Sequence, residues 1–234
     1  MMGPVLFFTG DHHFGHRNII DYCGRPFTDV DRMREFFIRT WNEDVGPDDD
    51  VWYLGDFALS RVGEQLELLQ RLNGHKVLVP GNHDAPFPAH RKHTAARRRY
   101  LDAGFDAILD EPMSLTIADH DVKISHFPYR GSGDHPNVRQ DRYEQYRPVN
   151  EGGWLLHGHV HERWRVRGRQ INCGVDAWSG HPVSLATIEY HITHPYPHDR
   201  TPWEWCWAAN YTEAELDEWM TEHGVAEASS KFDW

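Results

Sequence analysis

Five short polar clusters occur along the chain, and each follows a short apolar run. They are Asp11-His12-His13, Gly55-Asp56, Gly81-Asn82-His83-Asp84, Ser125-His126 and Gly158-His159-Val160-His161. Carboxylate, amide and imidazole groups bind divalent transition metals, and one carboxylate can bridge two ions. The ordered set therefore predicts a centre for two divalent metal ions, which is suited to the hydrolysis of phosphoesters.

Spacing within the clusters predicts which side chains act together. In an extended segment, side chains two positions apart point the same way, so Asp11 and His13 could bind one ion while His12 turns aside. Adjacent side chains diverge, so Asn82 could bind metal while His83 faces a substrate. Each cluster alone is weak evidence, because such residues are common in turns. The inference depends on the whole set lying at strand ends.

The expected charge of the centre also favours a phosphate substrate. Two divalent ions, set against Asp11 and Asp56 and otherwise neutral ligands, leave a net positive site. Ions about 3.5–4 Å apart can acidify a bridging water and stabilise both the attacking and the leaving oxygen of an in-line displacement. Mixed nitrogen and oxygen ligands suit Mn, Fe, Zn or Co.

The elements that must position these clusters follow from the apolar pattern. Strand-like runs at residues 5–9, 51–54 and 76–79 alternate with helical patterns at 31–45 and 64–72. This alternation predicts βαβ units and a mostly parallel sheet, whose ligands gather beyond the carboxyl ends of its strands.

The second half of the chain is predicted to be rich in β-structure. A hairpin is expected at residues 113–125, and further strands at 154–156, 163–166, 170–172 and 183–192. Residues 129–153 are polar and lack periodicity, which fits either a functional loop or a mobile surface loop.

Composition bounds the remaining possibilities. The 234 residues suit one domain over residues 1–193 with an extension, residues 194–234, that carries half of the ten tryptophans. We expect the extension to pack on the domain, with a dimer contact or a flap over the site as alternatives. The net charge of −12 disfavours broad binding to nucleic acid or anionic membranes.

The cysteines and the N-terminus indicate the compartment. Cys23, Cys173 and Cys206 are scattered without a CxxC pair, so a disulfide framework or a cysteine zinc site is not expected. No basic start with an apolar segment, and no stretch near the ~20 apolar residues of a membrane span, occurs in the sequence. A soluble, cytoplasmic protein is predicted.

The motif series Asp11-x-His13, Gly55-Asp56, Gly81-Asn82-His83-Asp84, His126 and Gly158-His159-x-His161 resembles the calcineurin-like metallophosphoesterases in every core motif, over residues 5–192. The segment 172–178, Asn-Cys-Gly-Val-Asp-Ala-Trp, resembles the stretch after the last motif in small bacterial and phage members. The resemblance implies a four-layer α/β/β/α sandwich.

The resemblance also implies two ligand sets that share one bridging carboxylate. The first set is Asp11, His13, Asp56 and His161, and the second is Asp56, Asn82, His126 and His159. His83 would face the phosphoryl group, where it stabilises developing charge or protonates the leaving oxygen. Asp84 would orient the ring of His83.

Residues beside the motifs are further candidates. His16 and Arg17 follow the first motif closely enough to reach the substrate, and they are equally suited to starting a helix. His157 could be a third ligand near the last motif, although a core histidine is the favoured interpretation.

The predicted function is a metal-dependent phosphodiesterase that acts on a small or nucleotide-type substrate by in-line attack of a metal-activated hydroxide. No separate cap domain is evident, and His83 can assist a poor alkoxide leaving group. A phosphomonoesterase would need further cationic groups, which Arg17, Arg25 or Arg130 could supply.

A nuclease and a non-catalytic scaffold are also compatible with the sequence. A nuclease could hold a strand on the arginines and tyrosines of residues 129–153. A scaffold could bind a protein partner through the extension, and a homodimer is possible.

Overall fold

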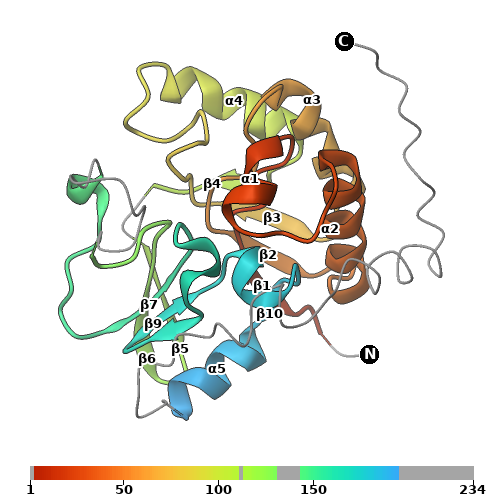
Figure 1. Cartoon of the computed structure of the whole chain (residues 1–234). Helices are drawn as coiled ribbons and strands as arrows, with labels where there is room; N and C mark the ends of the chain where they lie inside the picture. The colour runs from red at the N-terminus through yellow and green to blue at the C-terminus, as the bar shows by residue number, and fades with distance from the viewer. Residues whose placement is uncertain (1–2, 111–112, 131–142, 195–234) are drawn as a thin grey trace.

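Two five-stranded mixed sheets face each other and helices flank them (Figure 1). The computed structural model describes residues 3–110, 113–130 and 143–194, so the tryptophan-rich extension and much of the predicted loop at 129–153 lie outside the described residues. The α/β class and the two-sheet sandwich confirm the predicted fold.

The first sheet carries the first three motifs. Its strands, in spatial order, are β10 (Val183–Ser184), β1 (Leu6–Thr9), β2 (Asp50–Tyr53), β3 (His75–Leu78) and β4 (Ala107–Ile108). Strands β1 to β4 are parallel. Thr9 pairs with Tyr53, and Tyr53 pairs with Leu78, so these three strands end at the same level and place their following loops together.

Helices cover the outer face of this sheet. They are α1 (Arg17–Tyr22), α2 (Val30–Asp44), α3 (Val62–Leu66), the 3-10 helix η1 (Glu67–Arg71) and α4 (His93–Ala103). Helix α2 begins after Asp29, whose carboxylate accepts hydrogen bonds from the backbone N–H groups of Asp31 and Arg32. Its side chains Phe37 and Trp41 are fully buried in the outer core.

The second sheet carries the last two motifs. Its order is β5 (Met113–Ile117), β6 (His120–Ile124), β7 (Trp154–His157), β9 (Gln170–Asn172) and β8 (Val166–Arg167). The core between the sheets contains Phe8, Leu54 and Val79 from the first sheet and Ile124 and Leu156 from the second. Side chains alternate across the strands, so both faces of the first sheet are buried.

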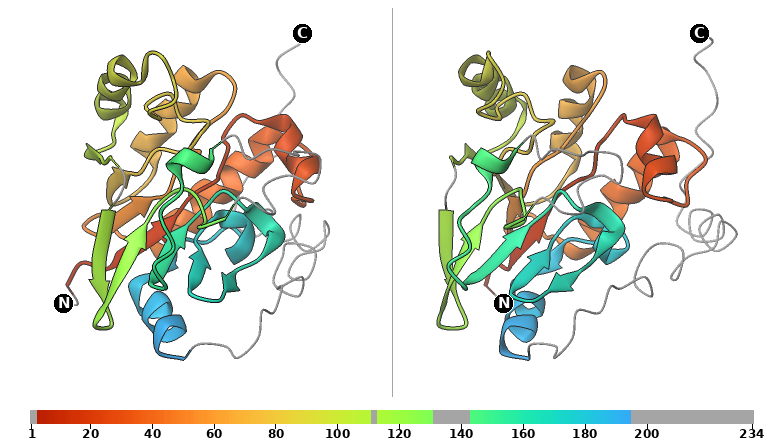
Figure 2. Two further views of the ribbon diagram at one scale, coloured as in Figure 1. Left: turned by 90° about the vertical axis from the view of Figure 1, so that its left-hand side faces the viewer. Right: turned by 60° about the vertical axis from the view of Figure 1, so that its left-hand side comes forward.

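One predicted strand is a helix. Residues 183–192 form the two-residue strand β10 followed by helix α5 (Leu185–Thr193), seen in blue beside the second sheet in Figure 2. Ser184 caps the helix, since its hydroxyl accepts a hydrogen bond from Thr187 N. Ile188 and Ile192 are one turn apart and both enter the inter-sheet core, so the apolar run has a helical period.

Two smaller elements complete the second half. Of the predicted strand at 163–166, Arg163 ends the 3-10 helix η3 (His161–Arg163) and Val166 begins strand β8. A further 3-10 helix, η2 (Glu144–Tyr146), lies in the described part of the predicted loop. None of the helices in the described ranges combines the length and the apolar character needed to cross a membrane.

Candidate metal centre

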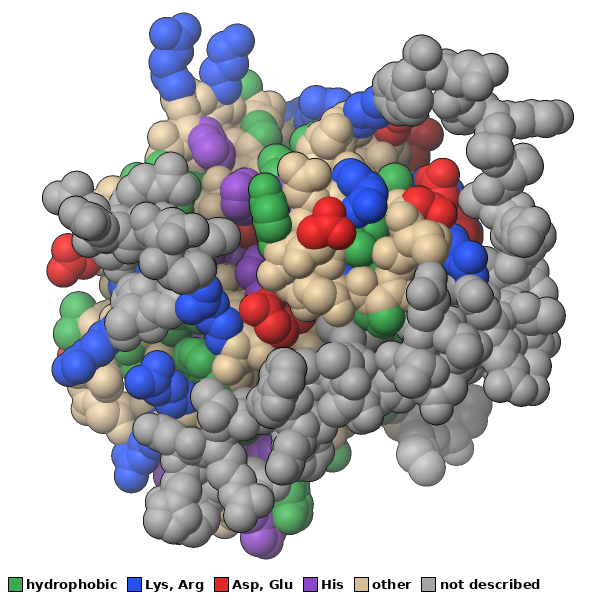
Figure 3. Space-filling model, viewed as in Figure 1, with side chains coloured by type: hydrophobic (Ala, Val, Ile, Leu, Met, Phe, Trp, Pro, Cys, Tyr) green, Lys and Arg blue, Asp and Glu red, His purple; other side chains and the backbone are tan. Residues whose placement is uncertain are grey.

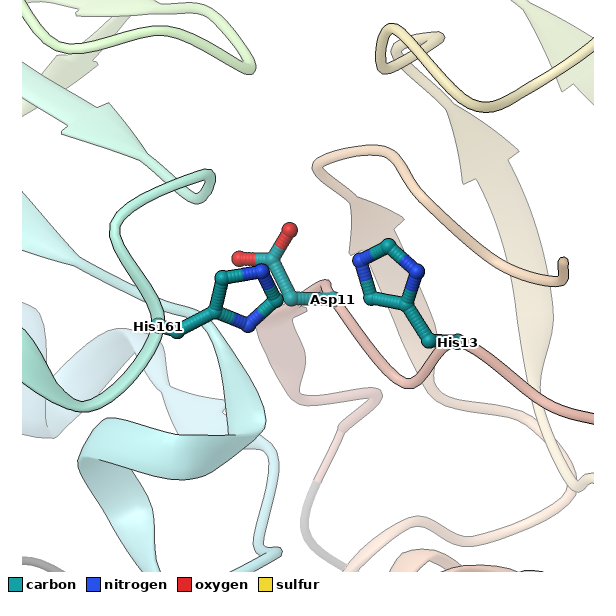
Figure 4. Close-up of side chains that lie close together, drawn as sticks. All are labelled: Asp11, His13 and His161. Atoms are coloured by element: carbon teal, nitrogen blue, oxygen red, sulfur yellow. The ribbon is translucent and has the colours of Figure 1, made fainter. Parts of the chain in front are cut away.

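The loops after the strands bring the predicted ligands into two groups. Asp11, His13 and His161 form one group, and Asp56, His126 and His159 form the other. Within each group, the candidate ligand atoms all lie within 4.8 Å of one another. Figure 4 shows the three side chains of the first group, which reach a common space from the loops after β1 and β7.

Asp56 lies between the two groups. Its Oδ2 atom is 3.4 Å from His13 Nε2 and 3.5 Å from His126 Nε2. Ligand atoms bound to one ion at ~2.1 Å lie about 3–3.5 Å apart, so this oxygen could serve an ion on either side. The arrangement has the geometry that the bridging assignment requires.

Asn82 joins the second group. Its Oδ1 atom lies 3.1 Å from His126 Nε2, and His159 Nδ1 lies 3.2 Å from the same nitrogen. Asn82 and His126 are both buried, at 6% and 0% exposure. The structure therefore brings all seven predicted metal ligands to one place.

The backbone at five of these ligands is unusual. Positive φ values occur at Asp11 (60°), His13 (52°), Asp56 (59°), His159 (71°) and His161 (51°). The left-handed region costs a non-glycine residue about 1–3 kcal/mol and is concentrated at functional sites. The prediction that Asp11 and His13 act together agrees with the structure, but its premise of an extended segment was wrong.

Several buried polar atoms of the first group are suited to a cation. Among the described residues, Asp11 Oδ1 and both ring nitrogens of His13 have no hydrogen-bond partner, although both residues are buried. An unsatisfied buried polar atom costs about 1–3 kcal/mol, which a bound cation would offset. The donor set and its unsatisfied atoms fit divalent ions.

Protonation states support the same fit. Burial raises the pKa of Asp11 to about 6, and burial lowers the pKa of His13 well below its usual value, so its ring is neutral and can donate a lone pair. Burial also opposes ionisation of Asp56, but nearby histidines, with His126 and His83 foremost, outweigh it and lower the pKa of that carboxyl. Asp56 therefore remains an anionic ligand at neutral pH.

His83 lies at the opening of the centre. Its side chain is exposed, and its ring centroid is 5.2 Å from that of His13. In the space-filling view, histidine side chains lie in a hollow near the middle of this face (Figure 3). The placement suits contact with a substrate.

Asp84 has a different role from the predicted one. Its Oδ2 accepts hydrogen bonds from the backbone N–H groups of Asp56 and Gly81, and its Oδ1 accepts one from Phe57 N. The carboxylate thus fixes the loop that carries the bridging Asp56. The prediction that Asp84 orients the ring of His83 is wrong, because its oxygens are directed to these backbone groups.

The candidate substrate-binding residues differ in their position relative to the ligand groups. The half-buried ring of His16 lies 5.7 Å from that of His13. Arg17 pairs with Asp21 at 3.3 Å on the exposed face of α1. Arg130 is exposed and borders the undescribed residues 131–142.

Arg25 cannot serve as a phosphate-binding group. It is 3% exposed and forms two hydrogen bonds to Asp176, at 2.7 and 2.8 Å. The two residues are 151 positions apart, so no local pattern in the sequence indicates their pairing.

Two histidines next to the ligands are structural. His12 is fully buried among aromatic rings, and its Nδ1 lies 2.6 Å from the hydroxyl of Tyr53. His157 is buried against Trp164, with ring centroids 4.6 Å apart. The favoured interpretation of His157 as a core histidine agrees with this placement.

Comparisons with known proteins identify relatives of the chain. No family model matches it. The gene 66 protein of Mycobacterium phage L5 is 34% identical over 199 residues, which cover 80% of this chain and 93% of the relative. An uncharacterized protein of Methanocaldococcus jannaschii is 44% identical over 192 residues, 78% of this chain and 88% of that protein.

A solved structure agrees with the fold. The crystal structure of a protein of unknown function from Aquifex aeolicus matches with a TM-score of 0.58 and 26% identity, and covers 80% of this chain and 98% of that one. The chain belongs to the family of the phage gene 66 proteins. Its motif series, paired sheets and His/Asp clusters resemble those of the calcineurin-like metallophosphoesterases.

Proposed function

We propose that the protein is a metal-dependent phosphodiesterase with a dinuclear centre, acting on a small or nucleotide-type substrate. The observation that carries the proposal is the position of Asp56 Oδ2, 3.4 Å from His13 of one ligand group and 3.5 Å from His126 of the other. Two divalent ions would supply charge neutralisation and an acidified water.

The described cationic groups favour a diester over a monoester. A terminal phosphate carries an additional negative charge, and a monoesterase would place further cations beside it. Arg25 is committed to Asp176 inside the protein, and Arg17 is paired with Asp21. Of the three arginines considered for that task, Arg130 alone is left, so the support for a monoesterase is weaker.

His83 supplies the proton chemistry in this proposal. Its ring is exposed, and its centroid lies 5.2 Å from that of His13 in the first ligand group. Donation of a proton to the leaving oxygen would assist a poor alkoxide leaving group. Asp84 contributes indirectly, since it holds the backbone of Asp56 through a hydrogen bond of 2.7 Å.

The test compares bis-p-nitrophenyl phosphate with p-nitrophenyl phosphate as substrates for metal-stripped protein resupplied with Mn²⁺. We expect diester hydrolysis that requires the metal and is lost in Asp56→Asn. Asp44→Asn is the matched control, because it changes a surface carboxylate that pairs with His181.

Two results would contradict the proposal. A monoester preference of about a hundredfold in kcat/KM would assign the centre to a phosphomonoesterase. Such a ratio corresponds to about 2.7 kcal/mol of transition-state stabilisation in favour of the monoester. Absence of turnover on these esters and on a panel of cyclic nucleotides, with two ions bound, would favour the non-catalytic scaffold.

A further inference from the structure

A buried ion pair lies directly behind one half of the candidate centre. Asp176 is fully buried in the 3-10 helix η4 (Val175–Trp178), and its Oδ2 lies 2.9 Å from His161 Nδ1. A carboxylate accepts a hydrogen bond from an imidazole N–H, so Nδ1 carries the proton in this contact. When the ring is neutral, the lone pair is then on Nε2, the nitrogen left to bind an ion with Asp11 and His13.

Arg25 extends this contact to the loop after β1. Besides Asp176, its guanidinium donates to two backbone carbonyls, those of His12 and Asp11, each at 2.7 Å. Asp11 and His13 hold left-handed backbone conformations in this loop. One fixed, planar group therefore links the strained ligand loop to the carboxylate that orients His161.

Asn172, which shortly precedes η4 in the chain, holds the backbone of His161. Asn172 is fully buried, and its amide donates to the carbonyl of His161 at 2.7 Å. Its side-chain oxygen accepts from Gly174 N at 2.9 Å. A Cβ atom at Gly174 would lie 2.5 Å from Asp11 Oδ2, so the chain passes behind Asp11 without room for a side chain. The residues 172–176 thus contact both the ring and the backbone of His161.

The second ligand group is held by other contacts. His126 Nδ1 lies 2.7 Å from the carbonyl of Leu54, and Asp84 holds the backbone of Asp56. These supports differ from Asp176 and Arg25, although the two halves also touch, since His159 N donates to Asp11 Oδ2 at 2.7 Å and His13 N donates to the carbonyl of Asp56 at 3.1 Å.

We propose that Asp176 and Arg25 are positioning residues for the half of the centre formed by Asp11, His13 and His161. Asp176 sets the tautomer and direction of the His161 ring, and Arg25 holds the carbonyls of the strained loop. This inference rests on the two-metal centre of the proposed function. A partner of this kind typically contributes a factor of about 10–100 to metal affinity.

The test measures Mn²⁺ binding by calorimetry on the full chain, together with the tautomer of His161 in the metal-free protein by nitrogen-15 NMR, at a pH high enough for the ring to be neutral. The variants are Asp176→Asn and the double variant Arg25→Met with Asp176→Leu. The double variant removes both buried charges together, so that no unpaired charge remains in the core. Asp44→Asn is the control, because that carboxylate lies 2.7 Å from Nδ1 of His181, a histidine outside both ligand groups.

We expect the double variant to lower the affinity for one of the two ions by about 10–100-fold, to lower the affinity for the other by less, and to lose the Nδ1–H tautomer of His161. Asp176→Asn should lose less affinity, because its amide oxygen can still accept the hydrogen bond. Asp44→Asn should bind both ions as the wild type does.

Three outcomes would overturn the positioning role. They are wild-type affinity for both ions in the folded double variant, equal weakening of both ions, and an unchanged His161 tautomer. Fewer than two ions bound to the wild type would instead contradict the proposed function, and the tautomer measurement would still decide the role of Asp176.

Discussion

A methyl group at Gly81 would collide with the carboxylate that the two ligand groups share. The Cβ atom of Gly81→Ala would overlap Asp56 Oδ1 and would lie 2.7 Å from Asp56 N and 2.8 Å from His126 Cε1. Ordinary contacts begin near 3.4 Å. Asp56 N cannot easily move, because it donates to Asp84 at 2.7 Å. Overpacking of this kind costs about 1–3 kcal/mol, and we expect a value near the upper end.

Equilibrium unfolding in urea and Mn²⁺ calorimetry would measure both consequences. Gly153→Ala is the matched control: neither glycine has a positive φ, and a Cβ atom at Gly153 would meet only Asp121 O, at 3.8 Å. The control should stay within about 0.5 kcal/mol of the wild type and bind both ions. The reasoning would be refuted if Gly81→Ala matched the control in stability and in metal binding.

Two further predictions concern histidines. His83→Gln should lower the rate by about 10²–10⁴ on a diester with an alkoxide leaving group and by less with a nitrophenolate, because only the alkoxide needs a proton; equal losses would exclude proton donation by His83. Burial lowers the pKa of His157 to about 3 from its ordinary 6.5, so the unfolded chain takes up this proton first as the pH falls. The stability of the metal-free protein should therefore decrease between pH 6.5 and 3, by up to ~1.4 kcal/mol per pH unit from this group. Urea unfolding of His157→Gln should show a smaller slope, and the exposed His120→Gln should not; an unchanged slope in His157→Gln would contradict this assignment.

Much of the fold could be predicted from local patterns. Residues 5–9 and 51–54 are short apolar runs that end at polar clusters, and strands β1 and β2 occupy nearly the same positions. Such runs are recognisable because strands buried on both faces are apolar throughout. Residues 183–192 show the limit of this reasoning, since a short apolar run fits a strand or a buried helix, and here the cap at Ser184 starts a helix.

The residues of the site could be predicted from the sequence, but the roles of Asp84 and Arg25 could not. Asp84 follows Asn82 and His83 in one motif, yet its carboxylate turns to backbone groups 27 and 28 positions away along the chain. Arg25 carries a charge that suits a phosphate, but its partner Asp176 is distant in sequence. A side chain's partner depends on which segments the fold brings together, and spacing within one motif holds no such information.

The sequence by itself determined the types and order of the ligands, because metal binding restricts them to a few residue types that follow buried strands. The division of these ligands into two sets was implied by the resemblance and not by their spacing, and only the tertiary structure shows its physical reason. His159 and His161 are two residues apart, yet they belong to different groups, because both have left-handed backbone conformations that redirect their side chains. The position of Asp56 between the groups depends on strand ends aligned by the pairing of β1, β2 and β3. Such alignment is a property of packed sheets, which form only when distant segments of the chain meet.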